Sequence, residues 1–263
     1  MSKITDAAKR PYTSLPDAST TAGGEDRRDA RLRHIVEGVL WVIGVVVLAS
    51  AAYYIHGHKG PLPGEVDFSR AVQAVHYWPW FLGLLTFLSA LNDIPPSIAS
   101  VTIVFVFFLL IRWFKDALFF LLTIAVGNTI NILIGDYVRR PRPSPNLIHV
   151  YTPLKFNSFP SGHTEHDVVF YGFLLYLSFT KEVREWRYRW VLIPFQIFAL
   201  VAILGIGYSR VLEGEHWVSD VLGGYLSGLL WLFLFIYLYR AFTDYLAQRQ
   251  SRRNAMVSTA PNV

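Results

Sequence analysis

The sequence predicts an all-α fold, an integral membrane bundle of six helices with a short interfacial helical segment after the first span. Composition is the first reason. Of the 263 residues, 53% are hydrophobic and 16% are charged, whereas about a quarter of the residues of a soluble domain are charged. Aromatic residues make up 16% and include 8 Trp, and such side chains gather where helices meet the membrane surface.

Six apolar stretches are the second reason, because a helix needs roughly 20 mostly apolar residues to cross the hydrocarbon core. Each stretch is uncharged or carries its charged residues near one end. The six predicted spans are residues 35–55, 95–111, 117–135, 162–180, 190–209 and 221–239.

Loop charge decides how residues 71–92 are interpreted. This stretch is uncharged, but Pro79 and a cluster of aromatic residues interrupt it. With six spans and both termini inside, 17 of the 24 Lys and Arg residues are cytoplasmic, whereas a seventh span would divide them 12 and 12. Because cytoplasmic loops carry the excess of Lys and Arg, the sequence favours six spans with residues 71–92 at the outer interface.

The predicted membrane domain covers residues 35–241. Residues 1–34 are polar and end in a basic run, which is typical of a disordered cytoplasmic tail. Residues 242–263 form a second polar tail. Both termini are therefore expected in the cytoplasm.

Charge and composition also limit the partners. In a membrane protein, the net charge of +5 reflects topology and attraction to anionic membrane lipids, and nucleic acid is not expected. The absence of cysteine excludes disulfides, thiolate metal sites and Cys nucleophiles. No cluster has metal-ligand spacing, so neither a metal nor a cofactor is predicted, and nothing indicates the oligomeric state.

Three polar stretches fall at one predicted face of the membrane. The first holds Arg139, Arg140 and Arg142, just after the third span. A basic, Pro-rich stop after a membrane helix is the simpler interpretation of these residues taken alone. Arg also binds two phosphate oxygens at once through its planar guanidinium group, so a phosphate site is the functional alternative.

The second stretch is Pro160-Ser161-Gly162-His163, at the start of the fourth span. Pro and Ser are ordinary residues at a helix start. A Gly there lets backbone N–H groups approach a ligand, and a helix N-terminus binds anions. His163 is placed to act as a general acid, although an interfacial histidine without a role is equally ordinary.

The third stretch is Ser209-Arg210-x5-His216-x3-Asp220, between the last two spans. Residues four apart share a helix face, so an Asp at 220 is able to orient the imidazole of His216 and leave Nε2 free to attack. A chance His beside a helix-start Asp is the alternative. The cost of an Asp entering a membrane span favours function.

Together these stretches resemble the type 2 phosphatidic acid phosphatases, a family related to glucose-6-phosphatase and the vanadium haloperoxidases. The family pattern is Lys-x6-Arg-Pro, then Pro-Ser-Gly-His, then Ser-Arg-x5-His-x3-Asp. The chain reproduces the last two without a mismatch and keeps Arg142 and Pro143 of the first. The resemblance covers residues from about 95 to 240. Counted back from Arg142-Pro143, the position of the family's Lys falls on Gly135, and counted back from Arg140-Pro141 it falls on Leu133. Neither residue is basic, and we expect Arg139 or Arg140 to supply the missing charge.

The resemblance implies a lipid phosphatase that forms a phosphohistidine and needs no metal. His216 would be the nucleophile, Asp220 its orienting partner and His163 the general acid. Phosphate would be bound by Arg142, Arg210, Ser161 and Gly162, with Arg139 and Arg140 as further candidates. The expected location is a bacterial inner membrane, with the site on the periplasmic or extracellular face.

The substrate and the exact activity stay open at this point. Phosphatidate, phosphatidylglycerol phosphate, an isoprenyl diphosphate such as undecaprenyl diphosphate, and lipid A phosphates all fit, and the isoprenyl diphosphate is favoured. The alternatives are a phosphotransferase of the same family, a phosphatase for a soluble ester such as glucose 6-phosphate, and a lipid-phosphate-binding protein impaired by the loss of the Lys. A transporter is disfavoured because the polar groups gather at one face instead of the midplane.

Overall fold

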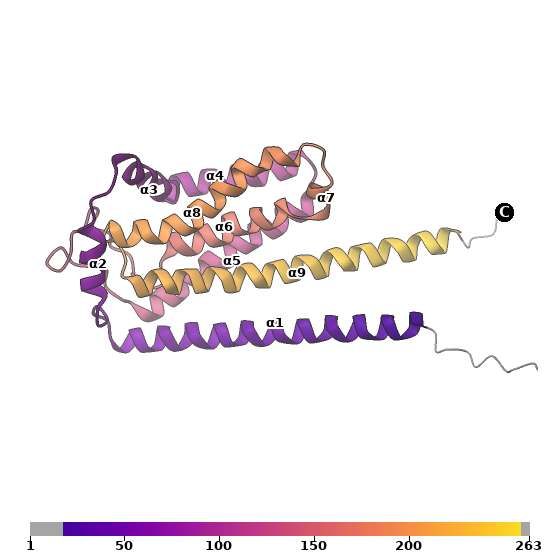
Figure 1. Cartoon of the computed structure of the whole chain (residues 1–263), viewed down its shortest axis with the longest axis horizontal. Helices are drawn as coiled ribbons and strands as arrows, with labels where there is room; N and C mark the ends of the chain where they lie inside the picture. The colour runs from indigo at the N-terminus through magenta and orange to yellow at the C-terminus, as the bar shows by residue number, and fades with distance from the viewer. Residues whose placement is uncertain (1–17, 259–263) are drawn as a thin grey trace, which may run out of the picture. The chain divides into compact units, whose positions relative to one another are not determined.

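The computed structural model describes residues 18–258, and every regular element in that range is helical (Figure 1). The α-helices are α1 (Ala18–Gly57), α2 (Glu65–Gln73), α3 (Pro79–Leu91), α4 (Ile94–Leu110), α5 (Phe114–Val138), α6 (Gly162–Ser178), α7 (Lys181–Arg184), α8 (Ile193–Leu212) and α9 (Val218–Ser258). A 3₁₀ turn, Arg189–Leu192, leads into α8. The all-α prediction is confirmed.

Both predicted tails are helical where the structure describes them. Residues 18–44 form a unit by themselves, the first part of α1, and the second unit begins at Val45. Helix α1 includes residues 18–34 of the predicted N-terminal tail. Helix α9 continues through the predicted C-terminal tail as far as Ser258. Ala, Arg and Gln are frequent in both segments and favour helix, so each helix extends past its apolar stretch. Residues 1–17 and 259–263 lie outside the described part of the chain.

Four helical segments of residues 18–258 are long and apolar enough to cross a membrane: Arg31–Gly57, Phe114–Val138, Arg189–Leu212 and Val218–Asn254. Helices α3 and α4 are bent by 71° at a short break and together make a possible fifth. Helix α6 has 17 residues. Several apolar spans are therefore present, whereas the count of six stays a prediction. Residues 71–92 form the end of α2 and the whole of α3 instead of one continuous helix.

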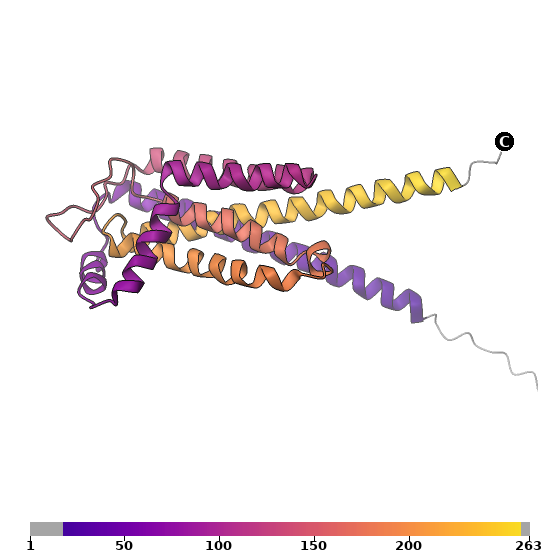
Figure 2. The same ribbon diagram turned by 90° about the horizontal axis from the view of Figure 1, so that it is seen from above.

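Helix α6 is the centre of the second unit and packs against α5, α8 and α9 (Figure 2). Its buried face contributes Val169, Phe170 and Phe173 to the main apolar core, opposite Phe120 of α5. Because lipid is as apolar as these side chains, close van der Waals packing holds such helices together.

Small residues on α9 allow a close approach to α6. A Cβ built on Gly224 would lie 2.6 Å from the backbone oxygen of Ser161, and one on Gly228 would lie 2.7 Å from the side chain of Val168. Asp220, Gly224 and Gly228 are four residues apart and share one helix face. The contact with α6 therefore brings Asp220 to the start of α6.

The polar helix ends gather at one end of this unit. Helices α5 and α8 end there, α6 and α9 begin there, and α2 crosses the same end (Figure 1). The three polar stretches of the sequence lie at these ends, as the spacing of the spans predicts. Sequence positions as far apart as 140 and 220 thereby become neighbours.

Candidate active site

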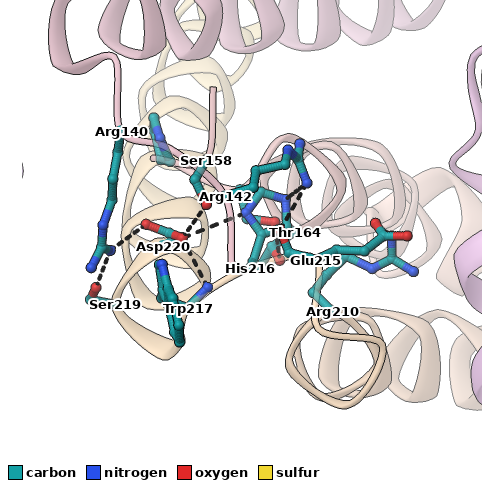
Figure 3. Close-up of polar contacts among 12 residues, drawn as sticks. Arg140, Arg142, Ser158, Thr164, Arg210, Glu215, His216, Trp217, Ser219 and Asp220 are labelled. Carbon is teal, nitrogen blue, oxygen red and sulfur yellow. Dashed lines mark hydrogen bonds and ion pairs between the residues drawn. The ribbon is translucent and has the colours of Figure 1, made fainter. Parts of the chain in front are cut away.

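His216 lies in the turn between α8 and α9 and is fully buried. An Nη1 atom of Arg142 lies 3.1 Å from its Nε2, and Oδ2 of Asp220 lies 3.8 Å from its Nδ1 (Figure 3). Burial, reinforced by the Arg142 guanidinium, lowers the pKa of His216 to about 4. The imidazole is therefore neutral at pH 7, and since a guanidinium only donates hydrogen bonds, Nε2 is the unprotonated nitrogen.

Asp220 is held from three directions. Its Oδ1 accepts from Nη1 of Arg140 at 2.6 Å, and its Oδ2 accepts from Oγ of Ser158 at 2.5 Å and from the backbone N–H of Trp217 at 2.9 Å (Figure 3). A carboxylate with this many donors keeps its charge and its orientation. It faces His216 as a fixed negative group.

Glu65 of α2 completes this arrangement, although no sequence motif pointed to it. Its carboxylate is buried, and it accepts from Nη2 of Arg140 at 2.6 Å and from the backbone N–H groups of Leu62 and Ser219 at 2.5 and 3.1 Å. The hydroxyl of Ser219 donates to Glu65 as well. We call Glu65, Arg140, Ser158, Ser219 and Asp220 the Asp220 cluster.

Arg139 and Arg140 are not placed where the sequence predicts them. Arg139 is the C-cap of α5 with φ of 51°, and its Nε donates to the backbone oxygen of Asp136 at the helix end. The chain turns there, so Arg140 points inward and divides its guanidinium group between Glu65 and Asp220. Two carboxylates already hold the charge of Arg140, and neither arginine lines the cavity described below.

Arg210 is buried at the end of α8 and is paired with acidic residues. Its Nη1 donates to Glu215 at 2.5 Å, and its Nη2 donates to Glu213 at 2.6 Å and to the hydroxyl of Ser89. Burial raises the pKa of Glu215, and the guanidinium of Arg210 opposes that shift. The acidic residues around the nucleophile therefore hold Arg210 beside His216.

The start of α6 supplies the remaining predicted residues. Ser161 is its N-cap and donates its backbone N–H to the backbone oxygen of Asp220 at 2.9 Å. Gly162 is exposed at the helix start. His163 points its Nε2 toward Asp93, 3.9 Å away, without reaching a hydrogen-bond partner among residues 18–258.

A cavity of about 1020 Å³ opens beside these residues. At its polar end it is lined by Arg142, Gly162, His163 and Glu215, and Gly135 also faces it. Leu82 and Leu85 of α3 form an apolar side. His216 itself does not line the cavity. Arg142 lies on its lining and contacts His216, so the guanidinium separates the imidazole from the open space.

The described part of the chain holds no group of three or more His, Asp or Glu side chains arranged to bind a metal ion. The guanidinium group of Arg142 and the start of α6 are the positive features that reach the cavity, and they suit an anion with several oxygens. Arg210 is paired with Glu213 and Glu215 and does not line the cavity.

Comparison with known proteins agrees with this chemistry. Residues 116–244 match the PAP2 superfamily. The chain is 29% identical over 164 residues to phosphatidylglycerophosphatase B of Bacillus subtilis, covering 59% of this chain and 74% of that protein. It is 30% identical over 139 residues to lipid phosphate phosphatase delta of Arabidopsis thaliana, covering 49% of this chain and 32% of the plant protein.

Two solved structures share the fold. A transmembrane PAP2 type phosphatidylglycerolphosphate phosphatase from Bacillus subtilis superposes with a TM-score of 0.62 at 23% identity, covering 78% of this chain and 96% of the other. LpxE of Aquifex aeolicus superposes with a TM-score of 0.51 at 20% identity, covering 65% of this chain and 93% of the other. Residues 116–244 contain every sequence-predicted site residue, and this part of the chain is a membrane phosphatase domain of the PAP2 superfamily.

Proposed function

We propose that this phosphatase hydrolyses a lipid phosphate or diphosphate through a phosphohistidine on His216, without a metal ion. The observation that carries the proposal is the environment of His216. The imidazole is buried and neutral, Arg142 lies at Nε2 and Asp220 faces Nδ1. A neutral imidazole with an oriented tautomer is a nucleophile, whereas a protein that only binds phosphate has no use for one.

In the first half-reaction the substrate phosphate replaces Nε2 as the acceptor of the Arg142 N–H groups. The Nε2 lone pair forms the N–P bond, and the bond between phosphorus and the lipid oxygen breaks. His163 gives its proton to the departing oxygen. Asp220 stabilises the positive charge that develops on the imidazole. Arg142, Arg210 and the backbone N–H of Gly162 stabilise the charge on the phosphoryl oxygens.

In the second half-reaction water attacks phosphorus. His163 accepts the proton of the water, the N–P bond breaks and inorganic phosphate leaves, which restores the neutral His216. The cationic groups supply the charge stabilisation that Mg²⁺ supplies in many phosphoryl-transfer enzymes. On this proposal Arg140 acts through Asp220 and does not contact phosphate.

The site is proposed to face the outside of a bacterial inner membrane, with both termini in the cytoplasm. The distribution of Lys and Arg over the loops supports this orientation. The chain lacks cysteine, so single cysteines at exposed Asn146 and Glu182 report the two faces. In intact cells a membrane-impermeant thiol reagent should label Asn146→Cys and spare Glu182→Cys, and the reverse pattern would overturn the orientation.

The decisive experiment measures phosphate release by the purified protein in detergent with EDTA, from a panel of lipid phosphates and diphosphates. Wild type is compared with His216→Ala and with His149→Ala, an exposed loop histidine. We expect release by the wild type and His149→Ala that vanadate blocks, loss in His216→Ala, and an acid-labile phosphoryl label that is trapped on the wild type and His149→Ala but not on His216→Ala.

Other outcomes separate the alternatives. Release that requires added Mg²⁺ would overturn metal independence. Activity retained in His216→Ala would overturn the phosphohistidine. Phosphate that appears on a second lipid instead of in water would identify a transferase, and lipid phosphate that binds without turnover would identify a binding protein whose chemistry was lost with the Lys replaced by Gly135.

A further inference from the structure

The cavity continues from the phosphate end along the contact between α5 and α6, and its wall there is polar. Asn128 and Asn131 come from one face of α5, and Glu165 and His166 come from the facing side of α6. We call these four residues the polar wall. They lie inside apolar helices, where polar side chains are costly and usually face a pathway or a cavity.

The polar wall carries buried acceptors that the protein does not satisfy. Both carboxylate oxygens of Glu165 and Oδ1 of Asn131 have no hydrogen-bond partner among the described residues. Glu165 is fully buried and Asn131 is 8% exposed. Asn128 and His166 contact each other, with Nδ2 and Nδ1 3.4 Å apart. Buried polar atoms of folded proteins are nearly always paired, so three unpaired acceptors on one cavity wall indicate a ligand that donates.

The backbone makes room for the Glu165 carboxylate at Gly127. A Cβ built on Gly127 would lie 2.3 Å from Oε1 of Glu165. The side chain is therefore seated against α5 in a space that any larger residue would fill. The absence of a side chain at 127 fits a structure that keeps a carboxylate at this depth.

Position along α6 relates the polar wall to the phosphate. Glu165 follows Gly162 by three residues, which is roughly 4.5 Å along the helix axis toward the membrane interior. When the phosphorus atom of the substrate lies at the start of α6, the substrate groups near Glu165 are those separated from phosphorus by a few covalent bonds of the lipid alcohol. In phosphatidate they are ester oxygens, and in an isoprenyl diphosphate they are the second phosphate, and both only accept hydrogen bonds. A hydroxyl group donates.

We propose that the polar wall is a subsite for a free hydroxyl on the lipid alcohol, so that the preferred substrate is a glycerol phosphate headgroup instead of a phosphatidate or an isoprenyl diphosphate. The inference rests on the proposed phosphatase function and adds its substrate class. The hydroxyl donates its single proton to one of the acceptors of Glu165 and Asn131 while the phosphate is bound at the other end of the cavity. Leu82 and Leu85 form the apolar side opposite.

The test uses two substrates that differ in one hydroxyl. Phosphatidylglycerol phosphate is compared with its deoxy analogue, in which the free 2-hydroxyl of the headgroup is replaced by hydrogen. The wild type should favour the hydroxyl-bearing lipid by about tenfold or more in kcat/KM, because the deoxy lipid leaves the buried acceptors unpaired. In Glu165→Gln, which exchanges one acceptor for a donor at nearly constant volume, the ratio should fall to about threefold or less.

Asp167→Asn is the matched control. Asp167 lies on the same helix and is equally buried, but it does not line the cavity. Its exchange should leave the substrate ratio at the wild-type value. A lowered ratio in this variant would mean that any buried charge on α6 affects selectivity, and it would overturn the assignment to Glu165.

The result for the wild type stands even if Glu165→Gln does not fold. Equal turnover of the two lipids overturns the hydroxyl subsite and leaves the phosphatase proposal intact. No phosphate release from either lipid or from any other in the panel overturns both. A wild-type preference for phosphatidate or for isoprenyl diphosphate over phosphatidylglycerol phosphate also overturns the subsite.

Discussion

The two sides of His216 differ in how their polar groups are satisfied. In the Asp220 cluster each carboxylate accepts from several donors, and Arg140 joins Glu65 to Asp220. On the cavity side, Glu165 and Asn131 bury acceptors with no protein donor in the described residues, and His163 leaves its Nε2 unpaired. Both regions are buried and polar, but the Asp220 cluster lies around helix ends, whereas Asn131 and Glu165 lie within α5 and α6.

This contrast distinguishes groups that fix the position of His216 from groups whose hydrogen-bond partner is expected to be the substrate. A buried network whose carboxylates each accept several hydrogen bonds fixes geometry, because moving any member leaves another charge unpaired. Unpaired buried groups cost stability of about 1–3 kcal/mol each, a cost that a ligand removes. The Asp220 cluster is therefore expected to govern kcat and folding, and the cavity side is expected to govern KM and selectivity.

The largest expected effect comes from breaking the paired side at Arg140. Arg140→Leu leaves the carboxylates of Glu65 and Asp220 buried without their shared cation, and such losses destabilise by about 3–5 kcal/mol. We expect a lower thermal midpoint and a kcat reduced at least about a hundredfold, with KM nearly unchanged in the protein that folds. Arg139→Leu, at an exposed helix cap, is the control and should stay near wild type. A rise in KM with unchanged kcat in Arg140→Leu would instead identify a phosphate ligand.

The pH profile tests the neutral state of His216. Its pKa is lowered to about 4 by burial and by Arg142, so protonation removes the nucleophile only as the pH falls through about 4, with roughly a tenfold loss per unit below it. Removing the cation in Arg142→Leu should raise that pKa and move the acid limb of kcat/KM upward. The substrate has the same pKa values in both assays, so a difference in the acid limb between the two enzymes comes from a group of the protein. Coincident profiles would contradict the assignment.

Glu65→Gln sharpens the comparison with a smaller change. The amide keeps the volume and one acceptor but loses the charge opposite Arg140, so Arg140 remains paired with Asp220 alone. We expect kcat to fall about tenfold while KM for the lipid phosphate stays within about twofold. Asp67→Asn, on the same helix, is the matched control in the same phosphate-release assay. An equal fall in kcat in the two variants would show that the loss of any carboxylate from α2 lowers kcat, and that the pairing of Glu65 with Arg140 is not the cause.

Gly135→Lys adds a cation to the cavity side. A Cβ at residue 135 meets Asn157 and Phe159 at 3.5 Å, an ordinary contact, and the position lines the cavity. Because a charge-assisted hydrogen bond to phosphate contributes about 1.5–3 kcal/mol, KM should fall about tenfold. Leu133→Lys, at an exposed position of the same helix, should change KM little. If Leu133→Lys lowers KM instead, the family's Lys aligns with Leu133, and its Arg-Pro pair aligns with Arg140-Pro141.

Gly127→Ala is expected to have the smallest effect. The added methyl group displaces the Glu165 carboxylate without removing it, so the preference for the hydroxyl-bearing lipid should narrow by about twofold to threefold with kcat on the deoxy lipid unchanged. Gly38→Ala, where nothing lies within 4 Å of the added Cβ, is the control. If Gly127→Ala leaves the kcat/KM ratio of the two lipids unchanged, the exact position of the Glu165 carboxylate does not affect selectivity.

Much of the fold followed from local features of the sequence. Long apolar stretches specify membrane helices because an unpaired backbone in lipid is too costly, and α1, α5 and α9 contain their predicted stretches. The helix in residues 18–34 was not predicted, because their polar composition was interpreted as disorder although the residues favour helix. Helix α9 continues through the predicted polar tail to Ser258. The bend between α3 and α4 was missed as well, since hydropathy carries no information on direction.

The sequence by itself predicted which residues react, because His216, Asp220 and Arg210 lie within one short stretch that matches the family pattern. The partners of these residues were decided only by the tertiary structure. Glu65 is 155 positions from Asp220 and reaches it through Arg140, and Arg140 faces inward because the chain turns at Arg139. Helix packing determines which charges are paired and which face the cavity, and no local pattern encodes a contact between segments so far apart.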